Sequence, residues 1–151
     1  MTFHFAYGSN MSRAVMLRHA PDAEPIGVAT LANHRFLITT HGHASVAPLV
    51  TRTVYGVLWR ITPRDRTTLA AWENIAGGLY RAAILPVRQA GQRRPALVYL
   101  ARSQVEAPPQ AGYMEVVVAA ALEWQLPLPY IEELRSWSLR QPHRFRAFRW
   151  T

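Results

Sequence analysis

The chain has 151 residues, of which half are hydrophobic and 11% are aromatic, and this composition excludes an intrinsically disordered protein. A length near 150 residues fits one domain with a substantial core. The sequence contains no cysteine, which excludes disulfides, a catalytic thiolate and cysteine-ligated zinc. Its formal net charge of +8 comes from arginine, because lysine is absent. We interpret this bias as a codon effect of a GC-rich genome, so the charge alone is weak evidence for a nucleic-acid partner.

The sequence predicts neither a membrane span nor a secretory signal. No apolar run approaches the roughly 20 residues that cross a bilayer. The first ten residues lack a basic start followed by an apolar stretch. We therefore expect no membrane partner and a cytoplasmic location.

Strands dominate the first part of the chain. A strand is predicted over residues 2–7, and a short helix follows with Asn10 or Ser12 as its N-cap and Pro21 as its stop. Further strands are predicted over residues 26–32, 35–40, 45–50 and 53–61. The last of these is the clearest, because its apolar side chains alternate between two faces, with Tyr55, Val57, Trp59 and Ile61 on one and Val54, Gly56, Leu58 and Arg60 on the other.

Helices and a hairpin fill the second part. Thr62 has the features of an N-cap, with Pro63 at the first helical position and Asp65 three residues later. The pattern then predicts, in chain order, a helix over 64–74, a strand over 79–88, a turn over 89–95, a strand over 96–101, a proline-rich loop over 103–112, the longest helix over 113–125 and a short helix over 129–137.

This order of elements favours a single α+β domain with a mixed, largely antiparallel, barrel-like sheet and peripheral helices. We assign residues 1–137 to this domain. Residues 138–151 form a tail rich in arginine and aromatic residues that has no periodicity.

Glu73 is the one carboxylate that neither solvent nor a helix dipole readily explains. It follows Leu69 by four residues and Trp72 by one, so it lies at the apolar stripe of its predicted helix. Burial against apolar walls raises the pKa of a carboxyl group toward the range that is useful for proton transfer. On position alone, a boundary glutamate bonded to a backbone N–H or to an arginine explains the pattern better.

The segment Tyr7-Gly8-Ser9-Asn10 ends a predicted strand just before a helix. Glycine lets the backbone approach a ligand, and successive N–H groups before a helix can bind an anion or an oxyanion. An ordinary strand-to-helix turn uses the same residue types, so the segment alone is a weak signal. It matches neither the phosphate loop nor the dinucleotide-binding glycine motif.

The other candidate sites are supported by weaker sequence signals. The sequence has no G-x-S-x-G nucleophile motif. His41 and His43 lie two residues apart, as metal ligands can, but no third ligand is evident, so we expect a polar loop. The tail alternates arginine with aromatic residues, which suits RNA, a membrane, or packing on the domain itself.

Taken together, the motifs resemble the gamma-glutamylcyclotransferase (AIG2-like) family. FAYGSNM resembles its glycine loop, VYGVLWRIT and LAAWENIAGGLY resemble its strand and catalytic glutamate with a tyrosine seven residues later, and APPQAGY and LPLPYIEEL resemble its C-terminal portion. The resemblance covers residues 3–137 in the same order. It departs at Asn74, where the family often has glycine, and over residues 40–52, which match poorly.

The resemblance implies a role for each matching residue. Glu73 would be the general acid and base. The γ-glutamyl group would be held by Tyr7, Gly8, Ser9 and Asn10, and the pocket would be lined by Tyr80, Tyr99 and Tyr113. The family's reaction uses no cofactor and no metal.

The implied enzyme is a transferase or lyase connected with glutathione metabolism. It would convert a γ-glutamyl amide, its small-molecule substrate, to 5-oxoproline and a free amine or amino acid. Two alternatives stay open: a γ-glutamyl-amine or γ-glutamyl-protected metabolite as substrate on the same fold, or a non-catalytic pocket protein whose basic tail contacts nucleic acid. The sequence fixes neither the leaving amine nor the oligomeric state.

Overall fold

The computed structural model describes residues 2–75 and 77–140, and its centre is a closed five-stranded barrel. The strands are β1 (Thr2–Ala6), β2 (Glu24–Ile38), β3 (Ala44–Ile61), β4 (Tyr80–Gln89) and β5 (Gln92–Ala101). They follow the spatial order β1-β3-β2-β4-β5. Every neighbouring pair is antiparallel except β1 and β5, which run parallel and close the barrel through His4 and Leu97. The predicted mixed, largely antiparallel barrel is confirmed.

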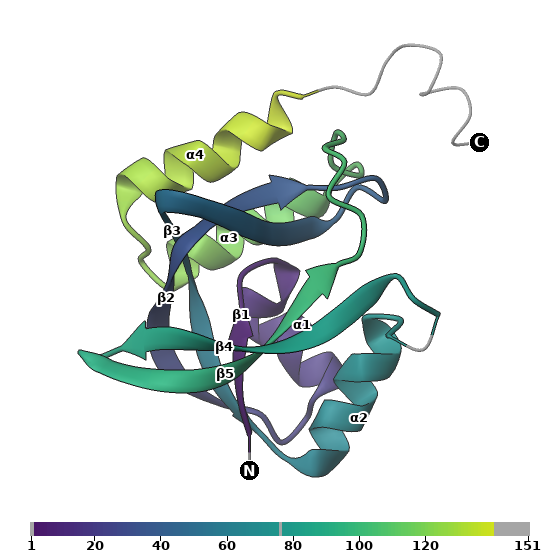
Figure 1. Ribbon diagram of the computed structural model, residues 1–151, viewed down its shortest axis with the longest axis vertical. Coiled ribbons are helices and arrows are strands. Elements are labelled where there is room, and N and C mark those ends of the chain that lie inside the picture. The colour runs from purple at the N-terminus through teal and green to yellow at the C-terminus, as the bar shows by residue number, and fades with distance from the viewer. Residues whose placement is uncertain (1, 76, 141–151) are drawn as a thin grey trace.

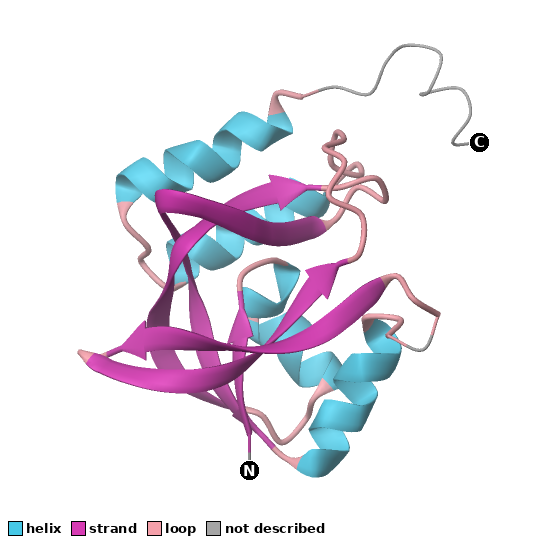
Figure 2. Cartoon of the chain, in the orientation of Figure 1, coloured by secondary structure: helices cyan, strands magenta, loops and turns pink. Residues whose placement is uncertain are grey.

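The helices lie on the outside of the barrel, as Figure 2 shows. They are the short 3-10 helix η1 (Ser9–Met11), α1 (Arg13–His19), α2 (Pro63–Trp72), α3 (Tyr113–Glu123) and α4 (Leu128–Ser138). In Figure 1, α3 and α4 lie together at one end of the barrel, and α2 lies at the other. Helix α1 contacts both η1 and α2, and η1 also packs against α3. Helix α1 therefore links α2 to η1, and η1 links these helices to α3, which also packs against α4.

Strands β2 and β3 are longer than the sequence predicts. The predicted segments 26–32 and 35–40 join into one strand, and so do 45–50 and 53–61. The joint in each strand is a residue with a positive φ, Asn33 at 59° and Thr51 at 73°. The register shifts between Ala32 and His34, and the Thr51 N–H donates to Asn33 Oδ1 at 3.3 Å. The β-bulge thus lets the pairing of β2 with β3 continue beyond polar residues at which the sequence pattern predicts an end of each strand.

The boundaries of three further elements differ from the predictions. The predicted turn 89–95 is only Ala90-Gly91, both with positive φ as two-residue hairpin turns require, and the polar residues after it belong to β5. The helix predicted over 113–125 ends at Glu123, and the predicted short helix extends to Ser138, so α3 and α4 have 11 residues each. Of the two predicted caps of α1, Ser12 is the one that accepts from the Val15 N–H.

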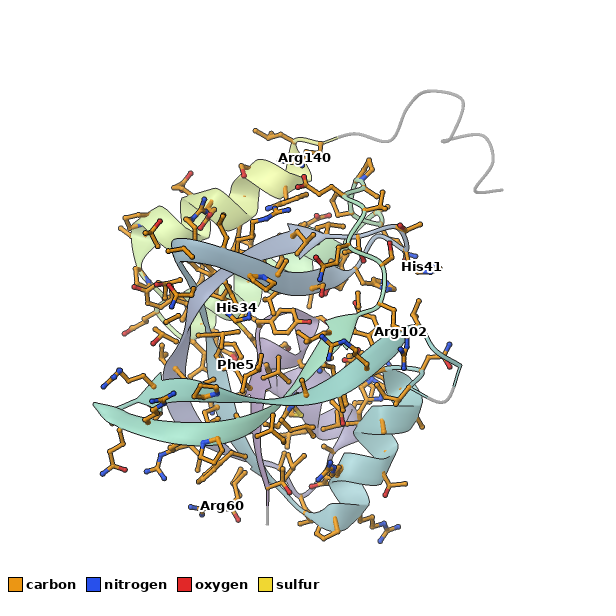
Figure 3. The ribbon with its side chains drawn as sticks, in the orientation of Figure 1. Phe5, His34, His41, Arg60, Arg102 and Arg140 are labelled. Atoms are coloured by element: carbon orange, nitrogen blue, oxygen red, sulfur yellow. The ribbon has the colours of Figure 1, made fainter. Side chains whose placement is uncertain are left out.

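The core fills the barrel and the spaces beneath the helices. Both predicted faces of the strand over 53–61 are largely buried, and Leu58 and Trp59, which lie on opposite faces, are fully buried; Tyr55 and Arg60 are the partly exposed members of these faces. Trp59 meets Trp124 at the end of α3 with ring centroids 6.0 Å apart. Figure 3 shows Phe5 at the centre of the molecule, whereas Arg60 and Arg140 extend from its periphery.

The described residues cover the predicted tail and the predicted lack of a membrane span only in part. Of the tail 138–151, residues 141–151 lie outside the described residues. Over the residues that are described, no helix has the length and apolar character needed to cross a membrane.

Candidate active site

A cavity of about 250 Å³ opens beside the C-terminal end of β1. Six segments of the chain contribute to its wall: β1 with the loop after it, the start of β3, the end of α2, the start of β4, β5 and the start of α3. All eight residues that the sequence singles out line this cavity, namely Tyr7, Gly8, Ser9, Asn10, Glu73, Tyr80, Tyr99 and Tyr113. The fold therefore brings together candidates that are up to about a hundred residues apart in the chain.

Glu73 follows directly after the last residue of α2. The sequence predicts a helical position, but the helix ends at Trp72, and Glu73 is its C-cap, with its N–H donating to Leu69 O at 2.8 Å. Asn74 then takes a left-handed φ of 54°, which turns the chain away from the helix axis. The half-buried carboxylate of Glu73 is thereby left at the wall of the cavity.

The surroundings of Glu73 hold its carboxyl group near the middle of its titration at neutral pH. Burial raises the pKa of Glu73 to about 7, and the hydrogen bond from Asn10 acts in the opposite direction. In that bond Asn10 Nδ2 donates to Glu73 Oε1 at 3.2 Å. A carboxyl group with this pKa can both accept and donate a proton near pH 7.

The loop after β1 is shaped by a close approach at Gly8. A Cβ atom on Gly8 would lie 2.7 Å from the Tyr113 hydroxyl oxygen and 3.3 Å from the Ala44 Cβ, so a larger residue would displace the tyrosine. The chain then turns through η1, where the Met11 N–H donates to Gly8 O at 3.0 Å. Trp124 at the end of α3 anchors this turn by donating from Nε1 to Met11 O at 2.7 Å.

Three of the four cavity tyrosines are bonded to the backbone. Tyr7 donates to Tyr99 O, Tyr80 donates to Ala44 O at 2.6 Å, and the Tyr113 hydroxyl accepts from the Ala44 N–H at 3.2 Å. Burial raises the pKa of Tyr113 to about 12 and the pKa values of Tyr7 and Tyr80 well above the ordinary value. These hydroxyls therefore stay neutral and fix the geometry of the wall.

Tyr99 differs from the other three. Burial and the nearby Glu73 carboxylate raise the pKa of Tyr99 to about 12, and Arg66 on the exposed side of α2 opposes this shift. Its ring lies 5.4 Å from the ring of His4. The Tyr99 hydroxyl is therefore neutral at pH 7, like those of the other three tyrosines.

Comparison with known proteins now identifies the family. The model of the AIG2-like family matches residues 53–134, which is more than half of the chain. The chain belongs to the AIG2-like family. The resemblance drawn from the sequence motifs is confirmed.

A curated relative and a solved relative of this AIG2-like protein are both named gamma-glutamylcyclotransferase. The chain is 28% identical to gamma-glutamylcyclotransferase from Homo sapiens over 145 aligned residues, which cover 88% of this chain and 77% of the relative. A solved structure named gamma-glutamyl cyclotransferase superposes with a TM-score of 0.84 at 25% identity, covering 94% of this chain and 89% of the other. The structure of YkqA from Bacillus subtilis gives a TM-score of 0.77 at 27% identity, covering 93% and 55%. These relatives support an enzyme of the gamma-glutamylcyclotransferase type.

Several lining residues of this AIG2-like protein were missed by the sequence analysis. His4 is buried on β1, and its Nδ1 donates to Leu97 O at 3.1 Å. Burial lowers the pKa of His4 to about 4, so the ring is neutral. A histidine in an apolar strand was the available signal, but only barrel closure shows that it faces the cavity.

Three of the other missed residues are partly exposed and form the rim of the cavity. Trp72 and Leu79 are sequence neighbours of Glu73 and Tyr80, and that adjacency was the available signal. His43, predicted to belong to a polar loop, lines the cavity with its ring 5.0 Å from the ring of Tyr113. Within residues 2–75 and 77–140, no group of three or more His, Asp or Glu side chains is arranged to hold a metal ion.

Proposed function

We propose that this protein is a cyclotransferase that converts a γ-glutamyl amide to 5-oxoproline and a free amine or amino acid, with Glu73 as general acid and base. One observation carries the proposal: a carboxyl group with a pKa of about 7 stands in a tyrosine-lined cavity, bonded to the loop after β1, in a member of the AIG2-like family. Glutathione, itself a γ-glutamyl compound, belongs to the candidate substrates.

The reaction forms one bond and breaks one. The α-amine nitrogen of the γ-glutamyl group attacks its own γ-carbonyl carbon, which closes a five-membered ring, and the bond from that carbon to the amide nitrogen breaks. Of the three protons on the initial α-ammonium group, one stays on the ring nitrogen and two pass to the departing amine, which leaves as an ammonium ion. Charge and atoms balance without any co-reactant.

Glu73 carries these protons one after the other. As a carboxylate it accepts the first proton from the ammonium group, which frees the lone pair of the nucleophile. As a carboxylic acid it then donates that proton to the departing nitrogen and returns to the carboxylate form for the second. A pKa of about 7 keeps both forms populated at neutral pH, and such catalysis is worth about 10²–10⁴-fold.

The walls of the cavity supply the geometry. Intramolecular attack requires a folded γ-glutamyl group, and holding two reacting groups in place can lower a barrier by about 7 kcal/mol or more. We assign this holding to Tyr7, Gly8, Ser9 and Asn10, with backbone N–H groups of the loop directed at the oxygen that becomes negative. The tyrosines, kept neutral by burial, complete the binding surface without adding charge.

The test is release of 5-oxoproline from a panel of γ-glutamyl amino acids, γ-glutamyl amines and glutathione. We expect the wild-type protein to release it and the Glu73→Gln variant to lose about 10²–10⁴-fold in kcat, since the amide cannot take up a proton. Matching circular dichroism spectra of the two proteins serve as the control for folding. Equal turnover by a folded Glu73→Gln variant would remove Glu73 from the mechanism.

A further inference from the structure

The cavity has a buried floor and a partly exposed mouth, and the two differ in chemistry. The mouth is formed by the lining residues that are not fully buried: Ser9, His43, Trp72, Glu73, Leu79 and Tyr113. The buried lining residues include three of the tyrosines, Tyr7, Tyr80 and Tyr99, and Asn10 of the loop to which we assign the γ-glutamyl group. Since Glu73 lies at the mouth and must reach the departing nitrogen, the leaving group of the substrate points outward past the mouth residues.

Trp72 is the large apolar side chain of this mouth. Its side chain is 39% exposed although it lies directly beside Glu73 in the chain. The ring is held in place by His19 of α1, with ring centroids 4.1 Å apart and planes within 16° of parallel. An exposed indole fixed by a stacked partner on one face offers a flat, rigid surface to a neighbouring group.

The charge of the mouth also favours an apolar or aromatic group on the substrate. Among the described residues that line the cavity, none is lysine or arginine, and the only acidic one is Glu73. Burial lowers the pKa of His43, so its ring adds no positive charge at neutral pH. The residues that line the mouth therefore supply apolar and aromatic surface, and none of them supplies a positive charge for a free carboxylate.

We propose that Trp72, positioned by His19 and flanked by Leu79, forms a subsite that selects substrates whose leaving amine carries an aromatic or large apolar side chain. This inference rests on the proposed function and names its substrate class. Contact with the indole would remove the leaving side chain from water and add aromatic attraction. Small leaving groups such as glycine would leave the indole exposed.

The first experiment compares γ-glutamylphenylalanine, γ-glutamylleucine and γ-glutamylglycine as substrates. For the wild-type protein we expect kcat/KM to be about tenfold higher for the phenylalanine compound than for the glycine compound. Trp72→Ala should bring this ratio close to one, chiefly by raising KM for the phenylalanine compound. Trp72→Phe should retain much of the ratio, and His19→Ala should reduce it in part because the indole loses its stacked partner.

Controls separate the subsite from the chemistry. Ile84→Ala removes another exposed apolar side chain, on β4 and away from the cavity, and should leave the ratio unchanged. Binding of the same three compounds to Glu73→Gln, measured by calorimetry, tests the subsite without turnover. If no compound releases 5-oxoproline but the calorimetry still shows tighter binding of the phenylalanine compound, the proposed function is overturned and the subsite proposal stands. An equal ratio in wild type and a folded Trp72→Ala variant would overturn the subsite.

Discussion

The pairing of Asn10 with Glu73 joins two side chains that are 63 positions apart in the chain. The sequence identifies each of them, Asn10 by its motif and Glu73 by its place beside apolar residues. It could not reveal the bond between them, because that bond depends on how η1 and the end of α2 meet outside the barrel. Two effects act in opposite directions on the pKa of Glu73. Burial favours its acid form, and the hydrogen bond from the Asn10 amide favours its carboxylate form.

This opposition predicts the pH dependence of the Asn10→Ala variant. Asn10 lowers the pKa of Glu73, so its removal should raise that pKa above about 7. The rising limb of kcat/KM against pH, which reports the carboxylate of the free enzyme, should therefore move to higher pH by roughly half a unit to one unit. A pH–rate profile of wild type and variant with the same substrate measures the shift.

The substrate's own ionisation is common to both profiles and cancels in the comparison. A folded Asn10→Ala variant whose limb stays in place, or moves to lower pH, would contradict the assignment of that limb to Glu73.

Helix α2 positions Glu73 at its C-terminal end, and the start of this helix was predictable from its N-cap residues. The Thr62 side chain accepts from the Asp65 N–H at 3.1 Å, and Pro63 occupies the first turn. Its end was less predictable, because Asn74 takes a left-handed conformation that the sequence pattern did not indicate. Local sequence rules identify the N-cap of a helix well, but they identify its last residue poorly when tertiary packing determines where the helix ends.

Loss of this cap should destabilise the protein. Thr62→Ala removes one acceptor for the free N–H groups of α2, which costs about 1 kcal/mol and lowers the Tm by roughly 3 °C for a chain of this length. Chemical unfolding in urea measures the difference through the midpoint.

Thr62→Ser is the matched control, since it keeps the hydroxyl group and should stay close to wild type. Equal losses in both variants would assign the effect to packing of the threonine methyl group instead of the cap.

The long strands show why element boundaries escape a local analysis. Asn33 and Thr51 are polar residues with positive φ, and each interrupts an alternating pattern that then resumes. The bulge that spans them is stabilised by the ladder between β2 and β3, which is a contact between distant segments. Likewise, a Cβ on Gly56 of β3 would collide with the carbonyl group of Ala6 and the ring of Phe5, a close approach that only the paired strands create.

For the whole molecule, the sequence predicted the class of fold and the members of the candidate site better than it predicted the topology. The order of motifs carried the resemblance to the family, and with it the barrel. The spatial order of strands does not follow from local pattern, because the parallel pairing of β1 with β5 joins His4 to Leu97 across most of the domain. The rim residues Trp72, Leu79 and His43 come from the end of α2 and from the positions just before β4 and β3, so their meeting at one cavity also depends on the tertiary fold.

The raised pKa of Glu73 also predicts how stability depends on pH. The folded state binds the proton of Glu73 more tightly than the unfolded chain does, since the pKa rises from 4.5 to about 7. Glu73 therefore favours folding below pH 4.5, and this contribution is lost as the pH rises through 7. Glu73→Gln removes the buried charge, so its Tm should exceed that of wild type by a few degrees at pH 8 and by much less at pH 5.

Thermal unfolding of both proteins at the two pH values measures this difference. His4 acts in the opposite sense, since burial lowers its pKa to about 4 and its contribution is lost as the pH falls from 6.5 toward 4. Because His4 is present in both proteins, its effect cancels. A difference in Tm that is the same at pH 5 and pH 8 would contradict a buried, ionising Glu73.

The contact between the first strand and the fifth has a consequence for how the molecule is made. The cavity wall takes residues from His4 through Tyr113, so during synthesis no shorter stretch of chain holds all its parts. The bond from Tyr7 to Tyr99 spans 92 positions, and contacts of such separation form late because the intervening chain must first be ordered. During synthesis the cavity would therefore stay incomplete until β5 and the start of α3 have emerged from the ribosome, and it would form in a single late step.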